Sequence, residues 1–164
     1  MATISRRRIL AGAAVTVPAG ALALITPTTA DAAEQQSGKH AREVVTRYFG
    51  ILNAGMASAD ADFSALRTVY APDAVLTQSS PAGVTHVYEG RHAVIGFYVS
   101  AWQNFHGLHW TQDHMRSLDT HVVLSYEHAG RPNQTKPGNC AHLFAVHRGL
   151  IDTLDWVTYY PGIP

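Results

Sequence analysis

The chain has 164 residues, of which 12 are lysine or arginine and 12 are aspartate or glutamate, so its formal net charge is zero. This balance gives no sign of the basic surface that binds nucleic acid or anionic membranes. The single cysteine, Cys140, cannot form an internal disulfide. The composition therefore indicates a globular protein that is stabilised by its core alone.

The first 32 residues have the layout of a secretory signal peptide. Three arginines at 6–8 precede an apolar run that reaches about Ile25, and "ADA" at 30–32 fits an A-x-A processing site. The stretch "SRRRIL" is similar to a twin-arginine export signal. We expect residues 1–32 to be removed and the mature protein to be secreted, with no membrane association after processing. A short membrane anchor is the alternative, although the run is interrupted and short for a span of about 20 residues.

A helix is predicted at the start of the mature chain. Residues 33–38 are polar and predict a flexible tail, and a helical pattern begins at Lys39. Its apolar residues recur at three- and four-residue spacing and form one face: Val44, Val45, Tyr48, Ile51 and Leu52. Asn53 and Gly55 are typical of a helix end. This helix would pack one apolar face against the rest of the domain.

The remaining pattern combines two further helices with strands. A short helix is expected from Asp62 to Tyr70, and an amphipathic helix over "RHAVIGFYVSAWQNF" at 91–105. Strand-like stretches separated by turn residues are found at 74–78, 84–90, 108–118, 121–129, 139–147 and 150–160. This order indicates one α+β domain over residues 39–164, with a curved antiparallel or mixed sheet wrapped around N-terminal helices. We expect an internal apolar pocket between the two layers.

Four stretches of this domain resemble the nuclear transport factor 2-like superfamily and, within it, the SnoaL-like branch. They are "RYFGILNAG" at 47–55, "LRTVYAPDAVL" at 66–76, "YEGRHAVIGFY" at 88–98 and "VHRGLIDTLDW" at 146–156. The resemblance covers residues 40–160 and implies the cone-shaped, cystatin-like roll of that superfamily. Its members include ketosteroid isomerase, scytalone dehydratase, polyketide cyclases, limonene epoxide hydrolase and non-catalytic binding domains. The fold therefore leaves the activity open.

The resemblance to ketosteroid isomerase implies a role for Tyr48. That family places an oxyanion-donating tyrosine at this point of the first helix, and a phenol hydroxyl can donate to developing negative charge in a dry pocket. The general-base aspartate of the family corresponds to Gln78, and an amide cannot take a proton from carbon. The second oxyanion donor corresponds to His142. Only the tyrosine donor, one of the three catalytic roles of that family, has a matching residue here. We therefore do not expect the steroid-type mechanism.

The polyketide cyclases offer a second comparison. Their acidic residue on the last strand corresponds to Trp156, and the neighbouring Asp155 should point to the opposite face of the sheet. The Asp–Arg–Asp relay of limonene epoxide hydrolase has no match that we can place. Both of these activities are therefore disfavoured.

Scytalone dehydratase resembles this chain in having histidines on two neighbouring late strands, which would be His109 and His142 here. Histidine is suited to acid–base work because its ordinary pKa lies near neutrality. Asp113 shares a strand face with His109 in "HWTQDH" and could orient it. The predicted catalytic set is therefore His142, His109, Tyr48 and Asp113.

A metal site is the alternative use of these histidines. A cluster of His109, His142 and Cys140 is conceivable, but zinc prefers three or four converging ligands. His114 would face away from His109 on the strand. We expect no metal and no cofactor.

The pocket wall predicts the kind of ligand. Six residues are expected to contact it: Gln78, Tyr98, Trp102, Phe144, Leu154 and Trp156. A wall of this type favours a small, flat, apolar compound. The sequence thus supports two hypotheses, an exported lyase or isomerase of dehydratase or cyclase type, and a non-catalytic binding or carrier protein of the same fold. A homodimer is expected through the exposed sheet face that carries Thr153, Asp155 and Val157.

Overall fold

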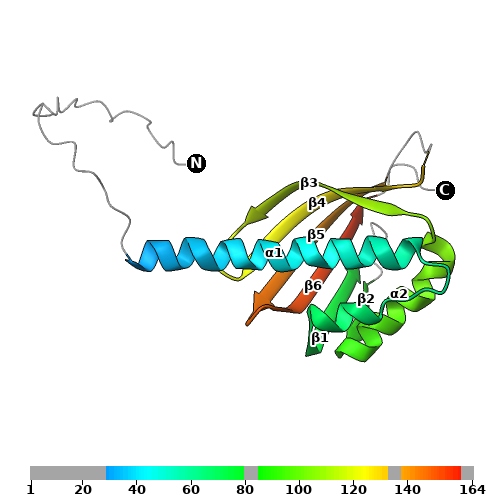
Figure 1. Cartoon of the computed structure of the whole chain (residues 1–164), viewed down its shortest axis with the longest axis horizontal. Helices are drawn as coiled ribbons and strands as arrows, with labels where there is room; N and C mark the ends of the chain where they lie inside the picture. Colours follow the sequence, from blue (N-terminus) through cyan, green and yellow to red (C-terminus); the bar gives the residue numbers. More distant parts are fainter. Residues whose placement is uncertain (1–28, 80–84, 133–137, 160–164) are drawn as a thin grey trace, which may run out of the picture.

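The computed structural model describes residues 29–79, 85–132 and 138–159. Residues 1–28, which hold most of the predicted signal peptide, lie outside the described residues. In the described ranges, two α-helices and a short 3-10 helix lie against one face of a six-stranded, curved sheet (Figure 1). The predicted α+β class is confirmed. None of the described helices is long and apolar enough to cross a membrane.

Helix α1, Thr29–Ala57, crosses the sheet and supplies the predicted apolar face (Figure 1). Val44, Val45, Tyr48 and Leu52 are all at most 3% exposed. Helix α1 includes residues 33–38, so it begins before Lys39, where the sequence predicts its start after a flexible tail. The Ser37 hydroxyl in this polar segment donates to the carbonyl of Thr120 at 3.3 Å.

The prediction of an α-helix at 62–70 is wrong. Ser64–Thr68 form the 3-10 helix η1, and Tyr70 already begins strand β1, Tyr70–Ser79. Tyr70 is in register with Ile151, whose N–H donates to the carbonyl of Val69 at 2.7 Å. Sheet pairing therefore outweighs the helical spacing of this short segment.

Helix α2, Arg91–Phe105, has the predicted bounds. Gly90, which precedes it, has a φ of 82°, in the left-handed region that glycine adopts at no steric cost. The helix buries Val94, Phe97 and Tyr98. The helix covers the sheet beside β1 (Figure 1).

The sheet has the strand order β2-β1-β6-β5-β4-β3. Its other strands are β2 Thr85–Glu89, β3 His109–Ser117, β4 Val122–Gly130, β5 Gly138–His147 and β6 Leu150–Tyr159. Neighbours are antiparallel except β1 and β6, which are parallel, so the sheet is mixed. The predicted strands are confirmed, with ends shifted by a few residues.

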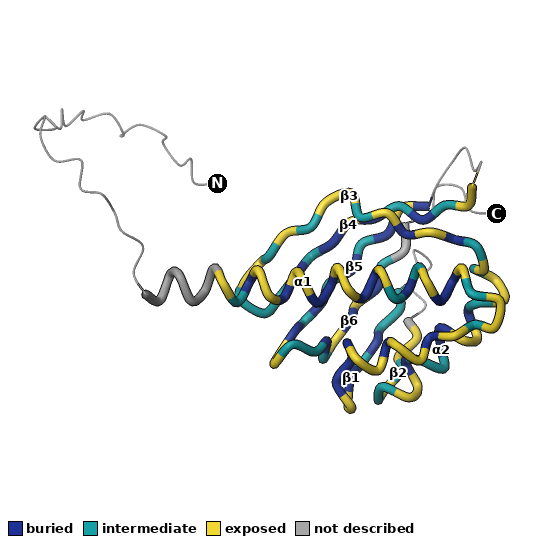
Figure 2. The backbone as a smooth tube through the Cα atoms, in the orientation of Figure 1, coloured by how far each residue is buried: buried dark blue, intermediate teal, exposed yellow. Residues whose placement is uncertain are grey.

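Burial alternates along β4 and β5, as expected of strands with an inner face against the helices and an outer face (Figure 2). Trp156 is buried and Asp155 is exposed, as the alternation predicts. In β3 the register shifts between Gln112 and His114, so Asp113 is an extra residue in that strand. The interior is filled by aromatic side chains, including Phe144, which is fully buried.

Gly55 provides a test of the packing between α1 and η1. A Cβ at this position would lie 2.4 Å from the ring of the buried Phe63, whereas a Cβ at Gly50 would meet nothing within 4 Å. We expect Gly55→Ala to lower the free energy of unfolding by about 1–3 kcal/mol through overpacking. Gly50→Ala should instead raise it by about 0.5–1 kcal/mol, since both positions are helical. Urea unfolding measures both, and equal effects of the two variants would contradict the packing described.

Candidate functional site

A buried histidine–carboxylate pair lies on the inner face of the sheet. His142 on β5 and Glu127 on β4 have side chains that are 1% and 0% exposed, and His142 Nδ1 lies 2.6 Å from Glu127 Oε2. A proton on Nδ1 satisfies this contact and leaves Nε2 as an acceptor. Within the described part of the chain, Nε2 has no hydrogen-bond partner. The pair therefore presents an oriented imidazole nitrogen to the interior.

Aromatic rings fix the plane of this imidazole. His142 stacks on Trp156 with ring centroids 5.3 Å apart and an interplanar angle of 28°. It also stacks on Phe144 at 5.9 Å and 25°, and Phe49 of α1 meets it edge-on at 5.5 Å. The ring is thus held by neighbours from two strands and a helix.

Three tyrosine hydroxyls form a chain close to the pair. The hydroxyl of Tyr98 on α2 lies 2.8 Å from that of Tyr48 and 3.1 Å from that of Tyr70. Burial raises the pKa of Tyr98 to about 12. Burial is also the main reason why the pKa of Tyr48 lies well above its ordinary value, and the tyrosine neighbours and Glu127 add to it.

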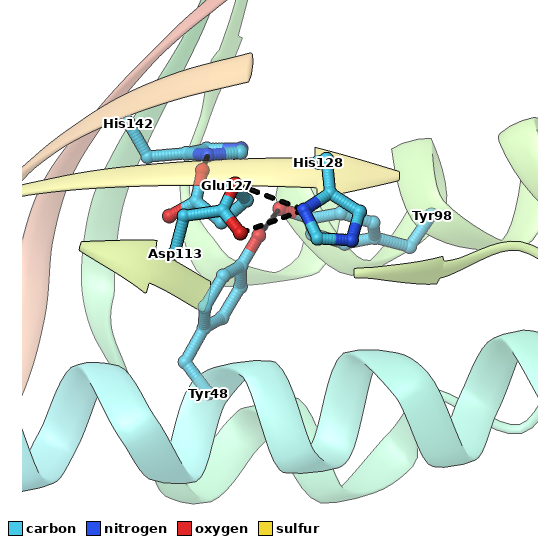
Figure 3. A network of polar contacts seen from close by, with 6 residues as sticks. All are labelled: Tyr48, Tyr98, Asp113, Glu127, His128 and His142. Atoms are coloured by element: carbon cyan, nitrogen blue, oxygen red, sulfur yellow. Dashed lines mark hydrogen bonds and ion pairs between the residues drawn. The ribbon is translucent and has the colours of Figure 1, made fainter. Parts of the chain in front are cut away.

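These raised pKa values mean that the hydroxyls are protonated at neutral pH and can donate. If Tyr70 donates to Tyr98 and Tyr98 donates to Tyr48, the proton of Tyr48 is available to a ligand. Figure 3 shows Tyr48 projecting from α1 toward Tyr98 and the strand that carries Glu127. The chain can thus direct a hydrogen-bond donor into the interior.

The predicted pairing of His109 with His142 is wrong. His109 is exposed at the start of β3, and β4 lies between β3 and β5. The prediction that Asp113 orients His109 is also wrong, because the carboxylate of Asp113 lies 2.7 and 2.9 Å from Nδ1 of His128. Both histidine–carboxylate pairs can be followed in Figure 3. Alternation explains this result, since Trp110 takes the inner position and leaves both predicted residues outside.

The predicted wall residues lie in the interior or at its margin. Trp102 and Gln78 are half-buried. The other four are buried, namely Tyr98, Phe144, Leu154 and Trp156. Gln78 is in register with Trp156, which is in register with His142. The structure places Tyr48 against Phe144 and His142 against Trp156, with ring centroids 5.3 Å apart in each pair.

The sequence reasoning missed Glu127. A signal was present in "VVLSYEHAG", where alternation places Glu127 and Ser125 on the same face as the apolar Val123 and Ala129. An acidic residue on the core face of a strand requires a partner. Finding that partner required the cross-strand register, in which Ser125 pairs with His142 and Glu127 with Cys140.

The structure does not bring His109, His142 and Cys140 together as a cluster. Searched over the described ranges, the chain has no group of three histidine, cysteine, aspartate or glutamate side chains that could hold a metal ion. Burial raises the pKa of the Cys140 thiol to about 11, so the thiolate that a metal needs is disfavoured. His109, the third member of the conceivable cluster, faces outward.

A family model for a SnoaL-like domain matches residues 45–153. The chain belongs to the SnoaL-like family. This match confirms the resemblance noted in the sequence. No protein of curated function matches the chain by sequence.

Solved structures share the fold of this SnoaL-like protein. Bal32a from a soil-derived mobile gene cassette has a TM-score of 0.58 and 16% identity, and the match covers 75% of this chain and 92% of that one. A proposed SnoaL-like polyketide cyclase from Jannaschia sp. CCS1 has a TM-score of 0.57 and 14% identity, covering 73% and 85%. A proposed SnoaL-like isomerase from Agrobacterium tumefaciens strain C58 has a TM-score of 0.58 and 12% identity, covering 74% and 99%. Identities this low establish the fold alone.

The buried pair of this SnoaL-like domain is closed from solvent. A surface groove of about 620 Å³ lies between α1 and the end of β3 and is lined by residues such as Arg42 and Arg116. A second hollow of about 280 Å³ is lined by Arg67, Arg91, His92 and Ile95. Neither contains His142, which is 1% exposed. A substrate that reaches Nε2 must therefore displace interior side chains.

Proposed function

We propose that this protein is a cofactor-independent lyase or isomerase acting on a small, largely apolar carbonyl or hydroxylated compound. The observation that carries the proposal is the Glu127–His142 pair, 2.6 Å apart and buried, with Nε2 of His142 left without a partner in the described chain. A carboxylate on Nδ1 fixes the tautomer and orientation of a catalytic imidazole. His142 would act as the base and Glu127 as its positioning residue.

The proposed reaction is proton transfer next to a carbonyl group. His142 Nε2 takes a proton from the carbon, the electron pair of that C–H bond forms a C=C bond, and the carbonyl π electrons move to oxygen. The Tyr48 hydroxyl donates to the resulting enolate, which is stabilised because the interior excludes water. In a β,γ-unsaturated ketone the enolate is a dienolate, and return of the proton to its γ-carbon shifts the C=C bond and gives isomerisation. In a β-hydroxy ketone, the enolate expels the hydroxyl group, which takes the proton from His142 and leaves as water.

A binding or carrier protein is the alternative. Two observations favour it: Gln78 stands where an isomerase relative has its general base, and Trp156 where the cyclases have their acid. Such a protein would hold the same ligand between Trp156 and Phe144 without altering it.

The proposal also includes secretion of the protein and its association into a homodimer. The twin-arginine-type segment supports secretion, although residues 1–28 lie outside the described part of the chain. The outer sheet face supports pairing with a second copy, since Thr153 and Asp155 are exposed and Val157 is half-buried. The partner of the pocket would be a small organic molecule.

Deuterium exchange in heavy water tests the catalytic proposal against the binding alternative. The protein is incubated with a panel of neutral cyclic ketones that carry enolisable protons. Each ketone is then recovered, and its mass is measured by mass spectrometry. We expect at least one ketone to gain deuterium next to its carbonyl faster with protein than with buffer. A ketone that binds and is recovered without deuterium would support a carrier and reject the enzyme.

A further inference from the structure

Three buried N–H donors on the inner face take no part in the proposed proton transfer. They are Nε1 of Trp110, Nε1 of Trp156 and Nε2 of Gln112, and none has a hydrogen-bond partner within the ranges that the structure describes. Trp110 and Trp156 are 3% and 5% exposed. A buried donor without an acceptor costs free energy, so each of these groups calls for a partner.

The three donors belong to one region of the sheet. The rings of Trp110 and Trp156 lie 6.5 Å apart and nearly perpendicular, at 77°. Both indole N–H groups lie close enough to the Cys140 thiol to lower its pKa as weak donors, against the larger effect of burial, although neither contact has the geometry of a hydrogen bond. Both donors therefore lie around the same sulfur atom. Gln112 is in register with Glu127, which is in register with Cys140. Thiol sulfur is only a weak acceptor and leaves both indole donors poorly satisfied.

Trp110 is held in place by its backbone. Asn53 of α1 accepts from the Trp110 N–H at 2.8 Å and donates to its carbonyl at 2.9 Å. This double hydrogen bond ties the backbone of β3 at Trp110 to the helix. A donor held in this way is suited to recognition, because little ordering remains to be done when a ligand binds.

The surrounding charge favours a neutral acceptor. Among the described residues, the buried polar or charged side chains are Ser125, Glu127 and His142, with no lysine or arginine. Glu127 raises the pKa of Cys140, which means that negative charge is disfavoured near the sulfur. A carboxylate or phosphate placed there would be uncompensated.

We infer that Trp110, Trp156 and Gln112 form a subsite for a neutral carbonyl oxygen of the ligand, beside the Glu127–His142 pair. The inference rests on the proposed function, because this oxygen belongs to the same molecule that His142 and Tyr48 act on. The ligand class is therefore a flat, neutral compound with two separate oxygen functions. One oxygen meets Tyr48, and the other meets the indole donors.

Calorimetric titration with two matched probes tests the subsite. 2,2-Dimethyl-α-tetralone carries one carbonyl, and 2,2-dimethyl-2,3-dihydronaphthalene-1,4-dione carries a second across the same ring system and cannot aromatise to a diol. Naphthoate is the anionic control. We expect the dicarbonyl to bind the wild-type protein about tenfold more tightly than the ketone, as one further buried hydrogen bond allows. Naphthoate should bind more weakly than either.

Variants test whether the tighter binding of the dicarbonyl depends on these N–H donors. Trp110→Phe keeps an aromatic ring but removes the N–H, and it should abolish the preference for the dicarbonyl while changing the affinity for 2,2-dimethyl-α-tetralone by less than about twofold. Gln112→Met, at a half-buried position, should reduce the preference if Trp110→Phe fails to fold. Tyr126→Phe is the control, because that aromatic side chain on β4 is 47% exposed and should leave the preference intact.

Three outcomes would overturn the subsite: no binding of the dicarbonyl to the wild-type protein, tighter binding of naphthoate, or an equal loss for both neutral probes in Trp110→Phe. These outcomes do not depend on turnover. If the wild-type protein shows deuterium exchange but no preference for the dicarbonyl, the subsite alone is rejected. A retained preference without any exchange would reject the catalytic proposal alone.

Discussion

Replacing His142 by glutamine is expected to lower the rate of deuterium exchange by about 100- to 10,000-fold, the usual contribution of a general base. Glutamine can still donate to Glu127, so the buried carboxylate keeps a partner, but its amide cannot accept a proton from carbon. The melting temperature should therefore change little. The measurement is initial exchange by mass spectrometry beside a thermal melt.

Two other histidine–carboxylate pairs supply controls for this variant. His128 with Asp113 and His147 with Asp152 have contacts of 2.7 and 2.6 Å, but their side chains are 36–51% exposed. His128→Gln and His147→Gln should exchange at the wild-type rate. Full activity of His142→Gln, or an equal loss in His128→Gln, would remove His142 from the mechanism.

Glu127→Ala is expected to lower the free energy of unfolding by about 1–3 kcal/mol, because it leaves the Nδ1–H group of the neutral His142 buried without an acceptor. The carboxylate is 0% exposed, so solvent cannot replace it. Asp152→Ala breaks a contact of the same length on the surface and should cost at most about 1 kcal/mol. Denaturant unfolding of the two variants measures the contrast.

A double variant separates stability from function. Glu127→Leu combined with His142→Leu removes both polar partners, and apolar replacement of a buried pair is often neutral or stabilising by about 1–4 kcal/mol. We expect this protein to recover most of the stability lost in Glu127→Ala while showing no exchange above buffer. If Glu127→Ala lowers the free energy of unfolding no more than Asp152→Ala does, the result would contradict the burial on which the site depends.

Both proposals require side-chain movement, because the interior is closed from solvent. His142 is 1% exposed and Trp156 is 5% exposed, so a ligand cannot reach either without movement of the side chains above them. Trp102 and Gln78, both half-buried, lie at the margin of this interior. A site that opens only to admit its ligand would exclude water during proton transfer.

The sequence alone determined the local features of this protein. Helical spacing gave the bounds of α2 and the buried face of α1 that carries Tyr48, because both depend on residues three and four apart. Strand alternation is also local, because neighbouring side chains point to opposite faces of the sheet. It placed Trp156 on the inner face and Asp155 on the outer face. The quoted family motifs indicated the fold, and with it the position of His142.

The tertiary structure alone decided which residues meet. Only the strand order shows that β4 separates His109 from His142, and only the register places Glu127 beside His142. The extra residue at Asp113 and the pairing of Tyr70 with β6 also depend on strands distant in the chain. Local periodicity fixes the face on which a side chain lies, but strand neighbours are chosen by packing of the whole sheet against its helices, which no short stretch of sequence contains.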